Sequence, residues 1–384
     1  MKLITVEVEG LLGRTGVVRA RFNDDLNIVT GRNGAGKTTF LKLIWYVLSG
    51  NISQAVSEIQ FNRIDLKTSE YRCEITRINP STCRAEFTDA TGVRRSIEDE
   101  YGHEDRPDFV LSDARDVLAE LVTPVGSSLF FPTFRRIEGG FTMGGPKGRL
   151  GPSSGPSRQL EDAMSGLARR MSNSDHSFVT SISTIDIESL LLKHYADLSE
   201  ESNRLQQTVS TEMIDVIRRY KSVPLEIAEG ETEAIESANH VINSVHQQIE
   251  EMETKRKAIM APMEAIQKLI AQFFQHSGIR FGTRLNFGDA ASAINSDSLS
   301  AGEKQMLSFI CYNAFKRDCI AFIDEPELSL HVDWQRLIFP TLLKQKSGNQ
   351  FIIATHSPFI YSKYPDKEIS IDGSSDRGDN LVVE

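Results

Sequence analysis

The sequence lacks any run of about 18 uncharged apolar residues, which is the length that a membrane-spanning helix requires. Its amino terminus carries Lys2 and leads into a predicted strand, not into a signal segment. Cysteine is scarce, and no two of the four cysteines have the CxxC spacing typical of zinc sites: they are Cys73, Cys83, Cys311 and Cys319. These absences disfavour a transporter subunit and predict a cytoplasmic protein with reduced thiols.

Basic residues are not in excess either. The chain has 43 Lys and Arg residues against 53 Asp and Glu residues, and its formal net charge is −10. This charge disfavours a basic surface that wraps nucleic acid. Short basic clusters remain, and each either contacts phosphates or forms a solvated helix face, of which the second is favoured. They are residues 135–136, 169–170, 218–221 and 255–257. DNA binding is therefore left open.

A phosphate-binding loop is the clearest motif that the sequence contains. Residues 31–38 read GRNGAGKT, directly after the apolar run 26–29 and before a predicted helix. In this setting the glycines let backbone N–H groups curl around phosphates, and the helix N-terminus favours negative charge. Lys37 is expected to reach the β- and γ-phosphates, and Thr38 to hold Mg²⁺. The residues expected to bind ATP here are Asn33, Gly34, Ala35, Gly36, Lys37, Thr38 and Thr39.

A second apolar run, residues 319–323, ends in two carboxylates. It is typical of a strand that is buried on both faces of a parallel sheet, and such strands end at the ligand crevice. Asp324 is expected to hold the metal through its water shell, and Glu325 to polarise a water for attack on the γ-phosphate. An acidic turn after a strand is common in α/β proteins, but its pairing with a phosphate loop indicates an ATP hydrolase.

Two further segments choose among the classes of phosphate-loop ATPase. Residues 299–305 read LSAGEKQ and precede a helical pattern, and residues 351–358 read FIIATHSP and form a predicted buried strand that ends in His356. The order of these motifs resembles an ABC-type ATPase head of the branch that contains SMC, RecF and overcoming-lysogenization-defect proteins (AAA_15/AAA_21-like). Ala301 and Glu303 stand where most transporters have glycine and glutamine, which also resembles SMC and RecF heads.

The resemblance implies that the LSxGE segment of one protomer caps the γ-phosphate bound by another, so that the active unit is at least a dimer. Ser300 offers a hydroxyl and Gly302 a backbone N–H at the start of a helix, and with Glu303 they are expected to contact ATP. His356 is expected to contact the γ-phosphate and the attacking water, which makes it, with Glu325, a predicted catalytic residue. Ser300 and Glu303 also form a plain capping box, which is the structural alternative.

Two shorter segments extend the resemblance. Residues 325–331, EPELSLH, occupy the position of the family's D-loop, which communicates across the dimer, so His331 is expected to contact the neighbouring protomer. Residues 132–138, PTFRRIE, resemble segments of defence-associated ATPases, and Arg135 or Arg136 is expected to have a nucleotide or interface role. The sequence offers no convincing candidate for the family's Q-loop residue.

The predicted fold is α/β: an ABC-type P-loop ATPase head with a mixed core sheet, an antiparallel accessory sheet and an inserted helical arm. Period-two alternation over about residues 58–98 predicts the accessory sheet. The insertion allows arms of about 40 Å, with a kink at Pro262, and a helical subdomain packed on the head is the alternative. The expected parts are the head at 1–138 and 277–384, a flexible Gly/Pro/Ser loop at 139–160 and the helical insertion at 161–276.

A second activity is not found in the sequence. Only 28 residues follow His356, too few for the Toprim nuclease of overcoming-lysogenization-defect proteins, and the eight histidines form no HNH or HExxH cluster. The sequence therefore predicts an ABC-type ATPase that hydrolyses ATP with Mg²⁺ at composite protomer interfaces and controls a separate effector, such as a nuclease. The resemblance suggests anti-phage defence, as in Septu, PARIS or retron-associated ATPase subunits. Two alternatives stay open: a RecF- or SMC-like repair ATPase that acts directly on DNA, and an ATP-stabilised scaffold with slow hydrolysis.

Overall fold

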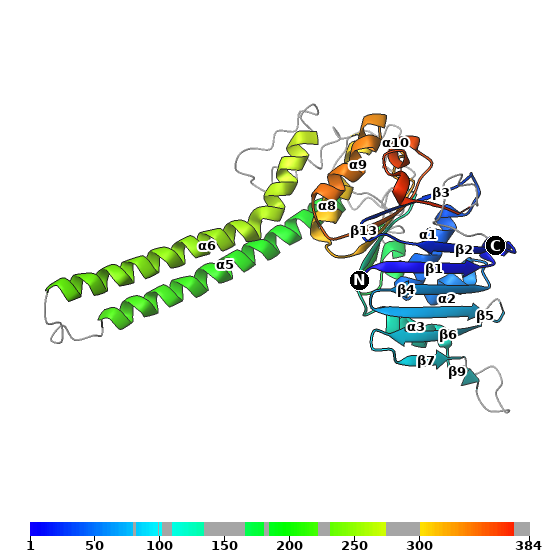
Figure 1. Ribbon diagram of the computed structural model, residues 1–384, viewed down its shortest axis with the longest axis horizontal. Helices are drawn as coiled ribbons and strands as arrows, with labels where there is room; N and C mark the ends of the chain where they lie inside the picture. Colours follow the sequence, from blue (N-terminus) through cyan, green and yellow to red (C-terminus); the bar gives the residue numbers. More distant parts are fainter. Residues whose placement is uncertain are drawn as a thin grey trace, which may run out of the picture. The chain divides into compact units, whose positions relative to one another are not determined.

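The computed structural model describes residues 1–79, 82–98, 100–101, 110–133, 166–179, 184–221, 231–273 and 300–371. These residues belong to two compact units (Figure 1). The first, which we call the head, contains Met1–Ile182 and Ser300–Glu384, and the second contains Ser183–Leu299. The predicted flexible loop at 139–160 and the two arginines Arg135 and Arg136 lie outside the described residues.

A six-stranded sheet forms the centre of the head, in the order β11-β10-β12-β13-β3-β14. Every residue of β3, β10, β12 and β13 is buried, which explains their apolar runs. The α/β class is confirmed. The sequence predicted a mixed core sheet, whereas the described strand pairs of this sheet are all parallel. The parallel setting expected for the run 319–323 is confirmed for β12, and only the expected mixture of strand directions is wrong among the described pairs. The strands are β3 (Leu26–Thr30), β10 (Ser128–Phe131), β11 (His176–Phe178), β12 (Ile320–Asp324), β13 (Gln350–Ala354) and β14 (Glu368–Ser370).

The second sheet of the head is antiparallel, in the order β2-β1-β4-β5-β6-β7. Its strands β5 and β6 alternate buried residues with more exposed ones, so the accessory sheet predicted from period-two alternation is confirmed. Helix α3 (Ala114–Val122) contacts β6 and β7, and helix α2 (Ile52–Glu58) contacts α3. The strands are β1 (Leu3–Glu9), β2 (Val17–Arg21), β4 (Arg63–Thr68), β5 (Tyr71–Arg77), β6 (Cys83–Asp89) and β7 (Arg94–Ile97), and a separate pair is formed by β8 (Glu100–Tyr101) and β9 (Val110–Ser112).

Helix α1 (Lys37–Leu48) contacts strands β10, β12 and β13 and helices α2 and α3. The ring of Trp45 lies 5.3 Å from that of Phe130 and 5.2 Å from that of Phe178, between ring centroids. Buried residues of α1 and of both sheets form one continuous hydrophobic core. This core fixes the position of the helix that begins directly after the phosphate loop.

Helix α8 precedes β12 in the chain, α9 lies between β12 and β13, and α10 follows β13. Phe309 and Tyr312 of α8 place their rings 5.3 and 5.4 Å from that of Phe131, at the end of β10. Helix α9 contacts both α8 and α10. The bounds are α8 (Ala301–Phe315), α9 (Val332–Lys344), α10 (Pro358–Tyr361), and the 3-10 helices η1 (Leu11–Gly13) and η3 (Pro365–Lys367).

The second unit is a hairpin of two long helices, α5 (Thr184–Lys221) and α6 (Glu231–Phe273), which pack against each other along their length (Figure 1). The more buried positions recur at alternating spacings of three and four, which is the pattern of a coiled coil. They include Leu198, Ser202, Leu205 and Val209 of α5 and Val241, Val245, Gln248 and Met252 of α6.

The hairpin helices are longer than the sequence suggested. They contain 38 and 43 residues, so at 1.5 Å per residue each is about 60 Å long and not about 40 Å. Helix α6 is one element that includes Pro262, so it does not restart there, and Figure 1 shows the helix bending in its C-terminal part. A proline inside a helix removes one backbone hydrogen bond and favours a bend without ending the helix. None of the described helices is long and apolar enough to cross a membrane.

Candidate nucleotide-binding site

The predicted phosphate loop lies between the end of β3 and the start of α1. Gly34 and Gly36 have φ angles of 79° and 98°, which residues with a Cβ rarely adopt. A Cβ at Gly36 would also come within 2.8 Å of the side chain of Leu12. Gly36 is the N-cap of α1 and offers no side-chain cap to the first N–H groups of the helix. Those groups are therefore suited to bind an anion.

Lys37 is buried, and its ammonium group is held in the loop by several acceptors. Nζ lies 3.0 Å from the Gly31 carbonyl oxygen, 3.4 Å from that of Arg32 and 2.6 Å from Nε2 of His356. Because an ammonium group only donates, Nε2 of His356 is the acceptor in this contact. The structure thus brings together two predicted site residues that are 319 positions apart in the chain.

Thr38 and Asp324, the two predicted metal-holding residues, are also in contact. The Thr38 hydroxyl lies 2.9 Å from Oδ1 and 3.0 Å from Oδ2 of Asp324 and donates to the carboxylate. Thr133, two residues beyond β10, donates a further hydrogen bond to Oδ2. Burial raises the pKa of the Asp324 carboxyl, whereas the hydrogen bonds from Thr133 and Thr38 lower it. A buried carboxylate of this kind favours a nearby cation.

The oxygen donors around Asp324 fit Mg²⁺. This ion prefers oxygen ligands and is often held by one or two carboxylates together with substrate phosphates. Among the described residues, no three His, Cys, Asp or Glu side chains form a cluster that could hold a metal alone. A magnesium ion here would therefore depend on Thr38, Asp324 and phosphate oxygens together.

Glu325, the predicted water-polarising residue, follows β12 in an unusual backbone conformation. Its φ angle is 48°, in the left-handed region that residues other than glycine seldom occupy. Its backbone N–H donates to the carbonyl oxygen of Ala354, at the end of the neighbouring strand β13, over 2.8 Å. Such conformations cluster at functional sites and persist where surrounding contacts fix them.

The predicted signature residues lie at the start of α8. Ser300 is the N-cap, its Oγ accepts from the Glu303 N–H over 3.3 Å, and Oε2 of Glu303 accepts from the Ser300 N–H over 2.7 Å. The capping box is therefore present, and a contact of these residues with ATP stays a proposal. A Cβ on Gly302 would lie 2.4 Å from the carbonyl oxygen of Ser329, so α8 packs closely on the turn after β12. His331 is the N-cap of α9, with an exposed ring.

Three residues next to this site were not identified from the sequence. Arg14 donates from Nη1 to the Ala35 carbonyl oxygen over 2.9 Å and from Nη2 to that of Gly34 over 2.8 Å, so it clasps the phosphate loop. Thr133 belongs to the segment 132–138, in which the expected role was assigned to Arg135 or Arg136 and not to Thr133. Glu327 contacts the backbone of His356. These contacts join distant segments, and the sequence motifs carry no sign of them.

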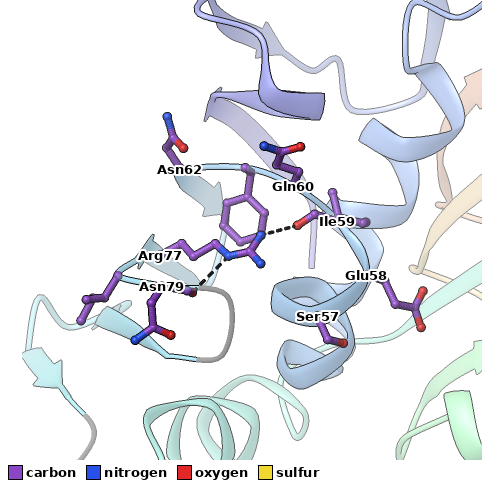
Figure 2. A pocket seen from close by; sticks show the side chains of 9 residues that line it. Ser57, Glu58, Ile59, Gln60, Asn62, Arg77 and Asn79 are labelled. Atoms are coloured by element: carbon purple, nitrogen blue, oxygen red, sulfur yellow. Dashed lines mark hydrogen bonds between the residues drawn. The ribbon is translucent and has the colours of Figure 1, made fainter.

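A pocket of about 460 Å³ lies elsewhere on the head, beside the end of α2 and the adjoining ends of β4 and β5 (Figure 2). Arg77 donates to the Ile59 carbonyl oxygen over 3.0 Å and to that of Asn79 over 3.2 Å, so its guanidinium helps to close the end of α2 (Figure 2). None of the predicted nucleotide residues lines this pocket; its walls are Ser57, Glu58, Ile59, Gln60, Phe61, Asn62, Arg77, Ile78 and Asn79.

The phosphate loop, the acidic strand end and the histidine meet at the carboxyl edge of one parallel sheet, and this arrangement defines a P-loop ATPase domain. A family model, AAA_21, described as "AAA domain, putative AbiEii toxin, Type IV TA system", matches residues 141–362, which is more than half of the chain. The chain belongs to this family. The match includes the acidic strand and His356, while the phosphate loop precedes it.

Solved structures that match this chain include SMC head domains. One is the Smc head domain with an extended coiled coil from Pyrococcus furiosus, bound to the C-terminal domain of ScpA, with 15% identity, a TM-score of 0.40 and coverage of 100% of this chain and 96% of that chain. Another, from Pyrococcus yayanosii, has 13% identity, a TM-score of 0.39 and coverage of 100% and 96%.

Proposed function

We propose that this chain binds ATP with Mg²⁺ and hydrolyses it. The observation that supports this best is the meeting of two pairs at one sheet edge, Lys37 with His356 and Thr38 with Asp324. The first pair joins residues that are 319 positions apart in the chain, and the second joins residues that are 286 positions apart. A purely structural turn has no need for a buried ammonium group and a buried carboxylate at neighbouring strand ends.

In this proposal the loop backbone and the start of α1 bind the β- and γ-phosphates, and Lys37 neutralises part of their charge. Thr38 and Asp324 would hold Mg²⁺, and Thr133 orients the Asp324 carboxylate through its hydrogen bond to Oδ2. When bound, the metal polarises the phosphate oxygens. The two remaining residues of the site, Glu325 and His356, act on the attacking water and the γ-phosphate.

Glu325 accepts a proton from the attacking water, and His356 orients the γ-phosphate beside Lys37. The left-handed backbone of Glu325 supports this role, because it turns the residue away from the strand direction just beyond the buried Asp324. In this proposal Asp324 therefore holds the cation and Glu325 activates the water.

We further propose that the complete site forms between two protomers. Ser300, Gly302 and Glu303 lie at the start of α8, where backbone N–H groups can cap a γ-phosphate held by the neighbouring chain. The exposed His331 ring lies at the start of α9 and would contact that neighbour. Gly302 packs on the carbonyl oxygen of Ser329, two residues before His331, so the starts of α8 and α9 lie close together.

The proposed role of the nucleotide cycle is to control a separate effector, such as a nuclease, in anti-phage defence. The family description names a putative toxin of a toxin–antitoxin system, which supports a defence setting. The hairpin exposes several isoleucines, as surfaces that bind partners often do: Ile214, Ile217, Ile242 and Ile249. The four cysteines are free and buried, which fits the reducing cytoplasm.

The proposal is tested by ATP turnover and by the mass of the protein in ATP and Mg²⁺, for the wild type and for Glu325→Gln. We expect turnover to fall about a thousandfold in the variant, while ATP binding persists and a closed dimer accumulates. Glu120→Gln, on the exposed side of α3, is the matched control and should behave as the wild type. Equal turnover by wild type and Glu325→Gln would contradict the role of Glu325.

Adding short duplex DNA to the same samples separates the alternatives. A dimer that forms only with DNA would favour a repair ATPase, and a large assembly without turnover in the wild type would favour a scaffold. A monomer under all conditions would contradict the composite site.

A further inference from the structure

Two chain segments leave neighbouring strands at the nucleotide edge of the parallel sheet. One is the acidic turn, residues 325–331, which follows β12, and the other is the histidine segment, residues 355–357, which follows β13. Strands β12 and β13 pair along their whole length, and the Glu325 to Ala354 hydrogen bond continues the pairing by one residue. Beyond that point, side chains must hold the two segments together.

Glu327 makes the connection with both carboxylate oxygens. Its Oε1 accepts a hydrogen bond from the His356 backbone N–H over 2.7 Å, and its Oε2 accepts one from the Thr355 hydroxyl over 2.8 Å. The same Thr355 hydroxyl accepts from the Ser357 N–H over 2.9 Å. Hydrogen bonds to an ionised carboxylate are stronger than those between neutral groups. Glu327 thus bonds directly to the His356 backbone, and the Thr355 hydroxyl links it to the Ser357 N–H.

The fixed backbone determines where the His356 ring lies. The side chain of His356 is exposed, so packing alone does not restrict its rotation. Its Nε2 nevertheless lies 2.6 Å from Nζ of the buried Lys37. The Thr355 N–H donates to the Val29 carbonyl oxygen of β3 over 3.3 Å, and Glu327 adds a restraint on the His356 N–H itself.

The acidic turn is tied equally closely to α8 and α9. Gln305 of α8 donates to the Pro326 carbonyl oxygen over 3.2 Å, and Gly302 packs on the carbonyl oxygen of Ser329. Gln335 of α9 donates to the Leu330 carbonyl oxygen over 2.9 Å. A displacement at the start of α8 must therefore move the turn that carries Glu327.

We propose that Glu327 is a positioning residue that sets His356 against Lys37 and couples this contact to the position of α8. The inference rests on the proposed function, since it describes how the same site is regulated. It assigns to one carboxylate the link between the signature helix and the histidine, within a single protomer.

The test compares Glu327→Ala with Glu327→Gln. The glutamine oxygen can still accept from the His356 N–H, and its amide can donate to the Thr355 hydroxyl, which serves as donor or acceptor. We expect Glu327→Ala to lower kcat about ten- to a hundredfold with little change in ATP affinity, and Glu327→Gln to restore most of the rate. Unchanged kcat in Glu327→Ala, or a loss of ATP affinity equal to the loss of kcat, would overturn the proposal.

A second measurement does not depend on turnover. Imidazole NMR signals of His356, assigned with His356→Gln, should shift in Glu327→Ala and stay in place in Glu327→Gln, while the signals of the other histidines stay constant in both. Unmoved His356 signals in a folded Glu327→Ala protein would overturn the inference. If the wild type does not hydrolyse ATP, the proposed function fails, and these signals still decide whether Glu327 holds His356. Should Glu327→Ala not fold, Thr355→Val, which removes one of the two acceptor contacts, takes its place in both measurements.

Discussion

The two sheets of the head place their charged residues differently. In strands β3, β10, β12 and β13 of the parallel sheet every residue is buried, and the one charged residue, Asp324, stands at a strand end. In the antiparallel sheet, charged residues lie within the strands and pair across them, as Arg63 does with Glu9 over 3.0 Å and with Glu74 over 2.6 Å. The parallel sheet thus brings chemistry from distant segments to one edge, while the antiparallel sheet covers the core and faces water.

Removing a large side chain should affect the parallel sheet most. Phe322 is fully buried in β12, so Phe322→Ala should lower the free energy of unfolding by about 3–5 kcal/mol. Phe87→Ala, in the antiparallel sheet, should cost less because Phe87 is slightly exposed and its cavity can admit solvent. Urea unfolding of both variants checks the order, and a larger loss in Phe87→Ala would break the comparison.

At the polar edge of the parallel sheet, we expect a substitution to change the affinity for ATP and not the free energy of unfolding. Lys37→Ala removes a buried ammonium group and should weaken ATP affinity about a hundredfold. Lys42→Ala is the matched control on the same helix, because Lys42 pairs with Glu58 over 2.7 Å, away from the loop. Calorimetric titration with ATP should separate the two variants, and equal affinities would exclude Lys37 from the nucleotide site.

His176, in the edge strand β11, should make the stability of the parallel sheet depend on pH. Burial lowers the pKa of His176 to about 4, against 6.5 for the free side chain. The folded state therefore favours the neutral ring, and its stabilising effect is complete above about pH 7 and is lost as pH falls from 6.5 towards 4. Between pH 8 and pH 5 the wild type should lose about 2 kcal/mol more than His176→Gln. Urea unfolding at both pH values measures this difference, and parallel curves would contradict it.

The smallest effect is expected in the antiparallel sheet. Arg63→Met removes the cation that faces Glu9, Asp65 and Glu74 and should cost about 1 kcal/mol, since the pairs are partly solvated. The cost should shrink in about 1 M NaCl, because salt screens the repulsion between the remaining carboxylates. A loss as large as that of Phe322→Ala would show that these pairs stabilise the fold as strongly as the core.

The site residues that could be predicted from the sequence are those that belong to a local sequence pattern. Lys37 and Thr38 follow a glycine-rich loop, and Asp324 and His356 end apolar runs, so each could be placed at a strand end without knowledge of the sheet order. Thr133 could not, because its contact with Asp324 exists only where β10 pairs with β12, across 191 positions in the chain. The roles assigned to these residues stay predictions until they are tested.

The same reasoning applies to the fold. Alternation within a strand reports one solvated face, and it gave the antiparallel sheet correctly. Burial on both faces correctly indicated a parallel setting for β12, whereas the mixed order expected for the whole sheet is not found among the described strand pairs. In α6, a single proline suggested a kink or a restart, and the helix bends in its C-terminal part but does not restart (Figure 1).

The strand that leads into the phosphate loop pairs only with strands from the far end of the chain. Within the described residues, β3 has β13 and β14 as its neighbours, and the Asn27 side chain bonds to the backbone of Phe351, 324 positions later. At the usual pace of translation, a ribosome needs on the order of half a minute to reach those partners. Until then a nascent chain holds an unpaired apolar strand and an unsupported loop. ATP binding would thus report that synthesis of the head is essentially complete.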